Sequence, residues 1–159
     1  FTPRSSDFDL TKESDVQRLF EKNGSFEVVI HLAAKVGGIG FNKVNQGSIF
    51  YDNLMMNTLV QEYSRRYSVK KFVGIGSVCE YPRTTPIPFK EENIWEGLPE
   101  ETNLSYGLTK RMVLEQGRAY KHQYGFNSIH LLLGNLYGPR DNFDLENSHV
   151  IPAIINKMS

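Results

Sequence analysis

Three short apolar runs alternate along the chain with segments of a different periodicity. The runs are 27–33 (EVVIHLA), 71–76 (KFVGIG) and 128–133 (SIHLLL), and polar residues or glycines flank them. A continuous apolar run of this length is typical of a strand in a parallel sheet, because such a strand is buried on both faces. The pattern therefore predicts three buried strands.

The segments between these runs have apolar residues at the spacing of one helix face, as Val16, Leu19 and Phe20 have. Helices are expected over 10–23, 48–67 and 106–123. Pro152 stands where the first turn of another helix would begin. Strands that alternate with helices form a parallel sheet with helices on its faces, so the predicted class is α/β.

The loops that follow the predicted strands meet at one edge of the sheet. In open α/β sheets, ligands bind at the carboxyl ends of the strands. The loops after Ala33, Gly76 and Leu133 all fall on that edge. The first is the glycine-rich segment 34–48, and the proline-rich segment 81–104 is expected to be a long irregular loop of the kind that usually has a function.

Composition and charge exclude several classes of protein. The 159 residues are 40% hydrophobic and carry 18 basic and 18 acidic side chains, so no basic excess points to nucleic acid or to an anionic membrane. A single cysteine forms no internal disulfide, and no apolar run is long enough to span a bilayer. We expect a cytoplasmic protein. One cysteine and scattered histidines have no metal-ligand spacing, so we expect no metal.

The segment SYGLTK places Tyr106 and Lys110 one helical turn apart. A cationic lysine beside a phenol is expected to lower the tyrosine pKa, and a tyrosine so tuned can transfer a proton at a substrate oxygen. A tyrosine and a lysine at this spacing more often simply lie on an exposed helix surface. Ser77 changes the balance, because it follows a predicted strand at the same sheet edge, where its hydroxyl can bind a substrate carbonyl.

Two further residues have both a structural and a chemical interpretation. Cys79, in GSVCEYP, is a small buried side chain in the first and an acid/base thiol beside Ser77 in the second. His149, in NSHVIPA, is a helix cap in the first and a proton shuttle in the second. By contrast, GGIG at 37–40 is an incomplete dinucleotide fingerprint, since its third glycine would fall on Lys43, and we interpret it as a flexible loop.

Taken together, the motifs resemble those of the extended short-chain dehydrogenase/reductase superfamily, and within it the GDP-L-fucose synthase family. The matching stretches are HLAAKVGGI, GSVCEYP, SYGLTK, GNLYGPRDNF and NSHVIPA, which cover almost all of residues 9–155. The cysteine in the serine turn, together with NSHVIPA, distinguishes this family from the 4-epimerases and 4,6-dehydratases. The resemblance implies a Rossmann-like doubly wound parallel sheet, NADP as cofactor (with NAD possible), a GDP-sugar substrate and a homodimer.

The resemblance also implies roles for individual residues. Tyr106 would be the general acid, Lys110 would tune it and hold the nicotinamide ribose, and Ser77 would bind the C4 carbonyl. Cys79 and His149 would shuttle protons at C3 and C5. The resemblance further implies that the cofactor is contacted by Asp9, Leu10, Leu32, Ala33 and Ala34. The nicotinamide and the sugar would lie near Asn135 and Leu136.

Several parts of the family pattern are missing. The glycine-rich first strand–turn–helix, the second strand and the C-terminal substrate domain have no counterpart, so 1–159 is expected to be a partial NAD(P)-binding Rossmann domain. The chain begins at Phe1 and ends within a helical start, which suggests a piece of a longer protein. Near position 157 the family favours arginine for phosphate, where Lys157 offers a point charge only.

Three alternatives stay open. One is another extended reductase, such as a nucleotide-sugar 4-epimerase or a dehydratase. The others are a noncatalytic nucleotide-binding protein and an inactive fragment. The Ser77, Tyr106 and Lys110 set argues against the noncatalytic interpretation.

Overall fold

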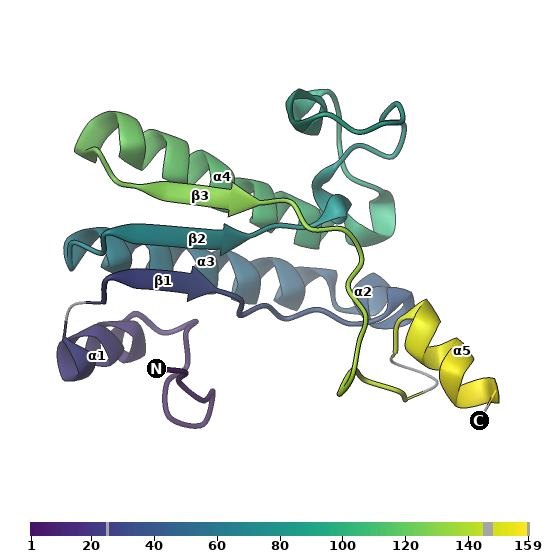
Figure 1. Cartoon of the computed structure of the whole chain (residues 1–159), viewed down its shortest axis with the longest axis horizontal. Helices are drawn as coiled ribbons and strands as arrows, with labels where there is room; N and C mark the ends of the chain where they lie inside the picture. The colour runs from purple at the N-terminus through teal and green to yellow at the C-terminus, as the bar shows by residue number, and fades with distance from the viewer. Residues whose placement is uncertain (25, 145–147, 159) are drawn as a thin grey trace.

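A parallel sheet of three strands organises the molecule (Figure 1). The computed structural model describes residues 1–24, 26–144 and 148–158. The strands β1 (Val28–His31), β2 (Lys71–Ile75) and β3 (Ser128–Leu131) pair in that order. In register, Ile30 pairs with Val73 and Val73 with Ile129. The three predicted strands are confirmed, although each is shorter than its apolar run.

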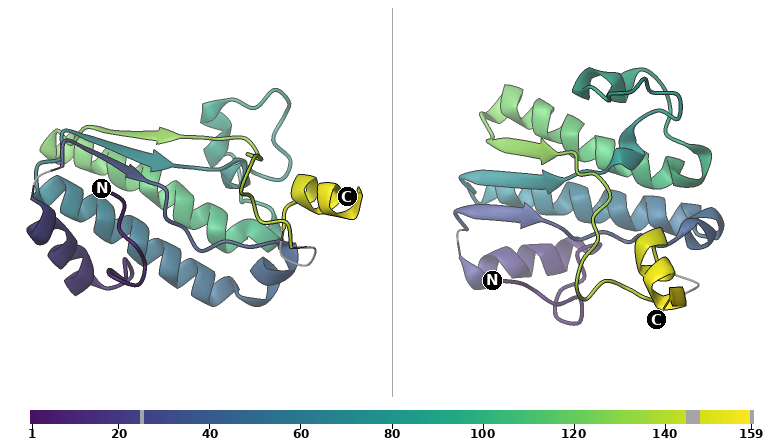
Figure 2. Two further views of the ribbon diagram at one scale, coloured as in Figure 1. Left: turned by 60° about the horizontal axis from the view of Figure 1, so that its bottom comes forward. Right: turned by 45° about the vertical axis from the view of Figure 1, so that its right-hand side comes forward.

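Helices cover one face of this sheet (Figure 2). They are α1 (Glu13–Asn23), α3 (Gln46–Arg66) and α4 (Leu104–Tyr124), and α5 (Val150–Met158) lies apart from the sheet. The three predicted helices are confirmed, with α4 starting two residues before the predicted boundary. Gly125 ends α4 in the left-handed region (φ 69°), a conformation that glycine adopts without steric cost.

The core lies between the sheet and this helical layer. Val16, Leu19 and Phe20 of α1 pack with Leu59 and Tyr63 of α3, as their helical spacing predicts. A second cluster joins the sheet to α3 and α4 and consists of Val60, Phe72, Val113 and Phe126. Phe72, the second residue of β2, is fully buried, so the middle strand packs directly against the helices.

The opposite face of the sheet is bare within the described residues. Val28 and Ile30 of β1 are 52% and 59% exposed, whereas His31, which points the other way, is 4% exposed. Side chains alternate between the two faces of a strand, so β1 has one buried and one open side. The structure thus contains one of the two helical layers of a doubly wound sheet.

Two predicted loops contain local structure. The glycine-rich segment 34–48 includes the short helix α2 (Ile39–Val44), because the Asn42 side chain accepts the Gly37 N–H (3.2 Å) and fixes this turn. The proline-rich loop forms the 3₁₀ turns η2 (Glu91–Trp95) and η3 (Glu101–Asn103). No helix in the described part of the chain is long and apolar enough to cross a membrane.

Candidate active site

Ser77 begins a tight turn at the carboxyl end of β2. It is the N-cap of the 3₁₀ turn η1 (Val78–Glu80), and its Oγ accepts the N–H of Cys79 (3.2 Å). The Ser77 N–H in turn donates to Glu80 Oε1 (2.7 Å). These two bonds form a capping box. Since Oγ is an acceptor within the turn, its own hydrogen can be donated to a group outside it.

Tyr106 and Lys110 lie in the first turns of α4, on the same face as predicted. Lys110 Nζ is 5.7 Å from the centroid of the Tyr106 ring and donates to the Ile75 carbonyl (2.8 Å). This bond ties α4 to the last residue of β2. Lys110 is only 2% exposed, so its ammonium is held in a fixed position beneath the sheet edge.

A close contact brings the Ser77 turn against the start of α4. Gly107 has no side chain, and a Cβ there would overlap the carbonyl oxygen of Cys79. The backbone of η1 therefore approaches α4 within one residue of Tyr106. Ser77, Cys79, Tyr106 and Lys110 consequently gather at the carboxyl edge of the sheet, as the topology predicts.

The pKa of Tyr106 differs from the prediction. Burial, followed by the nearby Cys79 and Glu80, raises the pKa of Tyr106 to about 12. Burial also lowers the pKa of Lys110, and Glu80 opposes that shift. The expected lowering of this pKa is therefore wrong for this chain, because burial is the largest cause of the shift and disfavours a charged phenolate. Tyr106 is a neutral phenol, which is the form that donates a proton.

His149 lies at another part of the same edge. It lines a pocket of about 180 Å³ with Asn135 and Leu136, so these three predicted residues are brought together. Cys79 is not in that lining, and no hydrogen bond among the described residues joins it to His149. Lys157 is exposed in the last turn of α5.

The other residues predicted to contact the cofactor lie before α1 (Asp9 and Leu10) or directly after β1 (Leu32, Ala33 and Ala34). Leu10, Leu32 and Ala33 line a pocket of about 300 Å³ beside this strand, and Leu32 is 70% exposed. Ala34 follows and is half-buried, whereas the Asp9 carboxylate accepts the Thr11 N–H (3.0 Å). In the described ranges, no three His, Cys, Asp or Glu side chains form a group that could hold a metal ion.

Sequence reasoning missed three residues around the Ser77 turn: Glu80, Arg111 and His130. All three contribute buried side chains that bond to one another or to the turn. Glu80 and Arg111 each stand next to a predicted site residue in the chain. No local pattern marks them, because charged side chains at such positions are usually exposed.

The donor groups at this edge fit a nicotinamide cofactor. A lysine ammonium has three hydrogens to donate, and among the described residues Lys110 donates one of them to the Ile75 carbonyl. Its other hydrogens suit the hydroxyls of a ribose. The apolar pocket along β1, with Leu10, Leu32 and Ala33, suits the remainder of a dinucleotide.

A parallel sheet with Ser77, Tyr106 and Lys110 at its carboxyl edge defines a Rossmann-like α/β fold of the short-chain reductase type. Residues 3–159 match the NAD dependent epimerase/dehydratase family, and the chain belongs to that family.

Curated relatives agree with this assignment. The chain is similar to the GDP-L-fucose synthase of Sinorhizobium fredii (strain NBRC 101917 / NGR234), with 42% identity over 149 residues, 94% of this chain and 47% of that protein. It is also similar to the probable GDP-L-fucose synthase 1 of Oryza sativa subsp. japonica, with 39% identity over 96% of this chain and 46% of that protein. The chain thus spans about half the length of the curated relatives it matches.

Solved structures share the fold. A GDP-L-fucose synthetase from Naegleria fowleri bound to NADP has a TM-score of 0.86 and 34% identity, covering 98% of this chain and 48% of that one. MlghC, a GDP-mannoheptose C4 reductase from Campylobacter jejuni with NADP bound, has a TM-score of 0.90 and 34% identity, covering 98% and 46%.

Proposed function

We propose that a full-length protein carrying this chain is a GDP-sugar epimerase and reductase that uses NADPH. Its substrate would be GDP-4-keto-6-deoxy-mannose and its product GDP-L-fucose. The observation that carries the proposal is the convergence of Ser77, Cys79, Tyr106 and Lys110 at one sheet edge, in a chain similar to GDP-L-fucose synthases.

Reduction at C4 uses the neutral form of Tyr106. The Ser77 hydroxyl donates a hydrogen bond to the C4 oxygen, and the Tyr106 phenol delivers a proton to that oxygen as negative charge develops on it. NADPH, when bound, supplies the hydride. Lys110 donates to the ribose of the cofactor and, as a cation 5.7 Å from the ring, stabilises the phenolate that remains.

Epimerisation uses the acidity that the C4 ketone gives to the neighbouring C–H bonds. Cys79 and His149 exchange protons at C3 and C5, one as base and the other as acid. The two residues come from separate elements, the η1 turn and the residue before α5. A sugar held between these elements meets one group on each side, with Asn135 and Lys157 as further substrate contacts.

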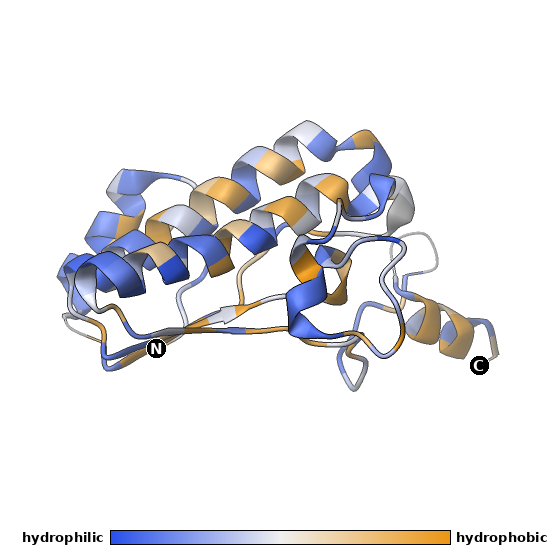
Figure 3. Ribbon diagram, turned by 90° about the horizontal axis from the view of Figure 1, so that it is seen from above, coloured by the Kyte–Doolittle hydropathy of each residue, from blue (hydrophilic) through white to orange (hydrophobic). Residues whose placement is uncertain are grey.

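Two broader properties belong to the proposal. The protein would be a homodimer that pairs through α3 and α4, where Phe50 and Met112 are 38% and 36% exposed. Figure 3 shows apolar positions along both long helices among polar ones. The proposed location is the cytoplasm, which is consistent with a chain that has one cysteine.

The proposal is tested with purified full-length protein, GDP-4-keto-6-deoxy-mannose and NADPH. Replacing Tyr106 by Phe should lower kcat/KM for NADPH oxidation by about 100-fold or more, because general acid catalysis contributes that much. Tyr124→Phe, at the far end of α4, is the matched control and should leave the rate unchanged. Wild-type rates in the Tyr106→Phe variant would contradict the role of Tyr106.

A second variant separates the two reactions. Cys79→Ser should abolish incorporation of solvent deuterium at C3 and C5 while NADPH oxidation with a pre-epimerised sugar persists. An enzyme that binds NADPH but acts only on UDP-sugars would be a 4-epimerase or dehydratase instead. A protein that binds the nucleotide and transforms no sugar would be a noncatalytic binding protein.

A further inference from the structure

A buried carboxylate lies directly behind the Ser77 turn. Glu80, the last residue of η1, is 0% exposed. Its Oε1 accepts the Ser77 N–H (2.7 Å), and its Oε2 lies 2.9 Å from Nε2 of His130 on β3. A carboxylate oxygen accepts hydrogen bonds, so the tautomer of His130 with its proton on Nε2 is the one that can donate to Glu80. One side chain therefore links the Ser77 turn to the neighbouring strand.

Glycine at position 76 makes room for this pair. A Cβ at residue 76 would overlap both Glu80 Oε1 and His130 Nε2. The His130 ring is almost fully enclosed, with a side-chain exposure of 5%, and its Nδ1 is buried with no hydrogen-bond partner among the described residues. Leaving a buried polar atom unpaired costs stability. Burying Glu80 and His130 thus costs free energy of folding. Two apolar side chains of similar volume would stabilise the fold at least as well.

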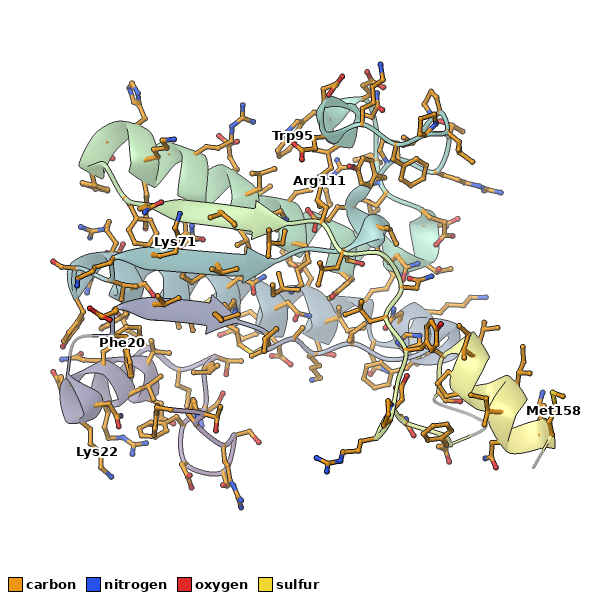
Figure 4. All side chains as sticks on the ribbon, in the orientation of Figure 1. Phe20, Lys22, Lys71, Trp95, Arg111 and Met158 are labelled. Carbon is orange, nitrogen blue, oxygen red and sulfur yellow. The ribbon has the colours of Figure 1, made fainter. Side chains whose placement is uncertain are left out.

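Arg111 holds the same turn from the side of α4. Its Nε and Nη2 donate to the Glu80 carbonyl (2.7 and 2.5 Å), and its Nη1 donates to the Gly97 carbonyl (2.8 Å). Figure 4 shows Arg111 and Trp95 between α4 and the loop that carries η2. Arg111 directly follows Lys110, so the helix that presents Lys110 also grips the end of the turn. Glu80 is therefore fixed through its backbone by α4 and through its carboxylate by β3.

We propose that Glu80 and His130 are a positioning pair, which orients the Ser77 hydroxyl and the Cys79 thiol toward the substrate through the Ser77 N–H bond. This inference rests on the proposed function and deepens it, because it assigns residues that act through Ser77 and Cys79 without touching the sugar. In the capping box the Ser77 Oγ accepts the Cys79 N–H, which leaves its own hydrogen to be donated to the substrate.

The carboxylate has a second effect on the same site. Glu80 is among the causes that raise the pKa of Tyr106, after burial and Cys79, and it also opposes the lowering of the Lys110 pKa. The charged or titratable groups around it are Cys79 and Tyr81 beside it in the chain, Tyr106, Lys110 and Arg111 on α4, and His130 on β3. The position and charge of Glu80 thus act on both proposed proton-transfer groups of α4, Tyr106 and Lys110.

The test compares Glu80→Ala with Glu80→Gln in the full-length protein. The alanine removes the acceptor of the Ser77 N–H, whereas the glutamine keeps an oxygen there. The first readout is the rate at which iodoacetamide alkylates Cys79, followed by peptide mass spectrometry without substrate or cofactor. The second is the division of the effect between kcat and KM for NADPH-dependent reduction. The control is Glu62→Ala, which removes a carboxylate that binds Arg65 and Arg66 near the end of α3.

We expect Glu80→Ala to speed alkylation of Cys79 about fivefold or more. It should also lower kcat about tenfold or more with little change in KM, because a small misplacement of a catalytic group slows the reaction strongly. Glu80→Gln should return both the alkylation rate and kcat most of the way to the wild-type values, and Glu62→Ala should change neither. Wild-type alkylation and kcat in Glu80→Ala would overturn the inference, as would a Glu80→Gln variant as impaired as the alanine. Should Glu80→Ala fail to fold, His130→Leu takes its place and should show the same two effects. If the wild-type protein reduces no GDP-4-keto sugar, the proposed function fails, while the alkylation comparison still decides the role of the pair.

Discussion

At the scale of single residues, His31 shows how burial controls a titratable group in this fold. The ring is 4% exposed, and its Nε2 lies 2.9 Å from Asn57 Oδ1. Asn57 Nδ2 then donates to the Thr109 carbonyl of α4 (3.2 Å). Burial lowers the pKa of His31 to about 4, the bond to Asn57 opposes this, and Lys110 adds to it. His31 is therefore neutral, and it links β1 to both long helices.

This burial predicts how stability changes with pH. The folded pKa of His31 lies below its unfolded value of 6.5, so the unfolded chain gains a proton first as the pH falls. The stabilisation of the folded state that comes from neutral His31 is complete above pH 6.5 and is lost as the pH falls toward 4. Between pH 7 and pH 5 we expect the free energy of unfolding to drop by about 2 kcal/mol on account of His31. Urea denaturation of the wild type and of His31→Gln checks this, and an equal pH dependence in the two proteins would contradict it.

At the scale of elements, the contact between β2 and α4 sets the site. Lys110 reaches the Ile75 carbonyl because Gly74, one residue earlier, lets α4 lie close to the strand. A Cβ at residue 74 would meet Cγ1 of Val113 at 2.7 Å, well inside normal contact. The spacing between these two elements thus depends on a missing side chain in the middle strand.

Gly74→Ala is therefore expected to push α4 away from β2. Overpacking of this kind should lower the free energy of unfolding by about 1–3 kcal/mol, as measured by chemical denaturation. The matched control is Gly47→Ala in α3, where a Cβ would meet nothing within 4 Å. That variant should be neutral or more stable by up to about 1 kcal/mol, because alanine favours the helix. Equal effects of the two substitutions would contradict this account of the contact.

At the scale of the whole molecule, the most unusual feature is that one face of the sheet exposes apolar side chains. Ile30, Val73 and Ile129 are aligned across the three strands by their register. Ile30 and Ile129 are 59% and 38% exposed, and Leu32 continues the apolar surface beyond β1. A contiguous exposed apolar surface of this kind is uncommon on a soluble monomer.

The 159-residue chain is therefore expected to bind the dye anilinonaphthalene sulfonate and enhance its fluorescence. Replacing Ile30 and Ile129 together by Thr should lower the enhancement about twofold or more, because the continuous apolar surface is interrupted. The control is Ile87→Thr in the proline-rich loop, a residue that is 90% exposed but lies away from the sheet. A loss of dye binding in the control equal to that in the sheet variant would show that the sheet face is not the site of binding.

Local patterns predicted most of the elements and the convergence at the sheet edge. The apolar runs gave the strands, because burial on both faces demands continuous apolar sequence, and Val16, Leu19 and Phe20 correctly marked the buried side of α1. The short helix α2 was missed, since it is fixed by the Asn42 side chain rather than by apolar periodicity. Strand ends were placed one or two residues too late, because the apolar runs extend past His31, Ile75 and Leu131, the last residues of the three strands.

What the sequence determined by itself is the α/β order, the resemblance that the family match then confirmed, and the shared face of Tyr106 and Lys110, all of which depend on residues close together in the chain. Only the tertiary structure decided the pKa of Tyr106 and the partnership of Glu80 with His130. Both depend on burial and on contacts between segments far apart in the sequence. Burial acts through the whole surrounding volume, and no local pattern along the chain records it.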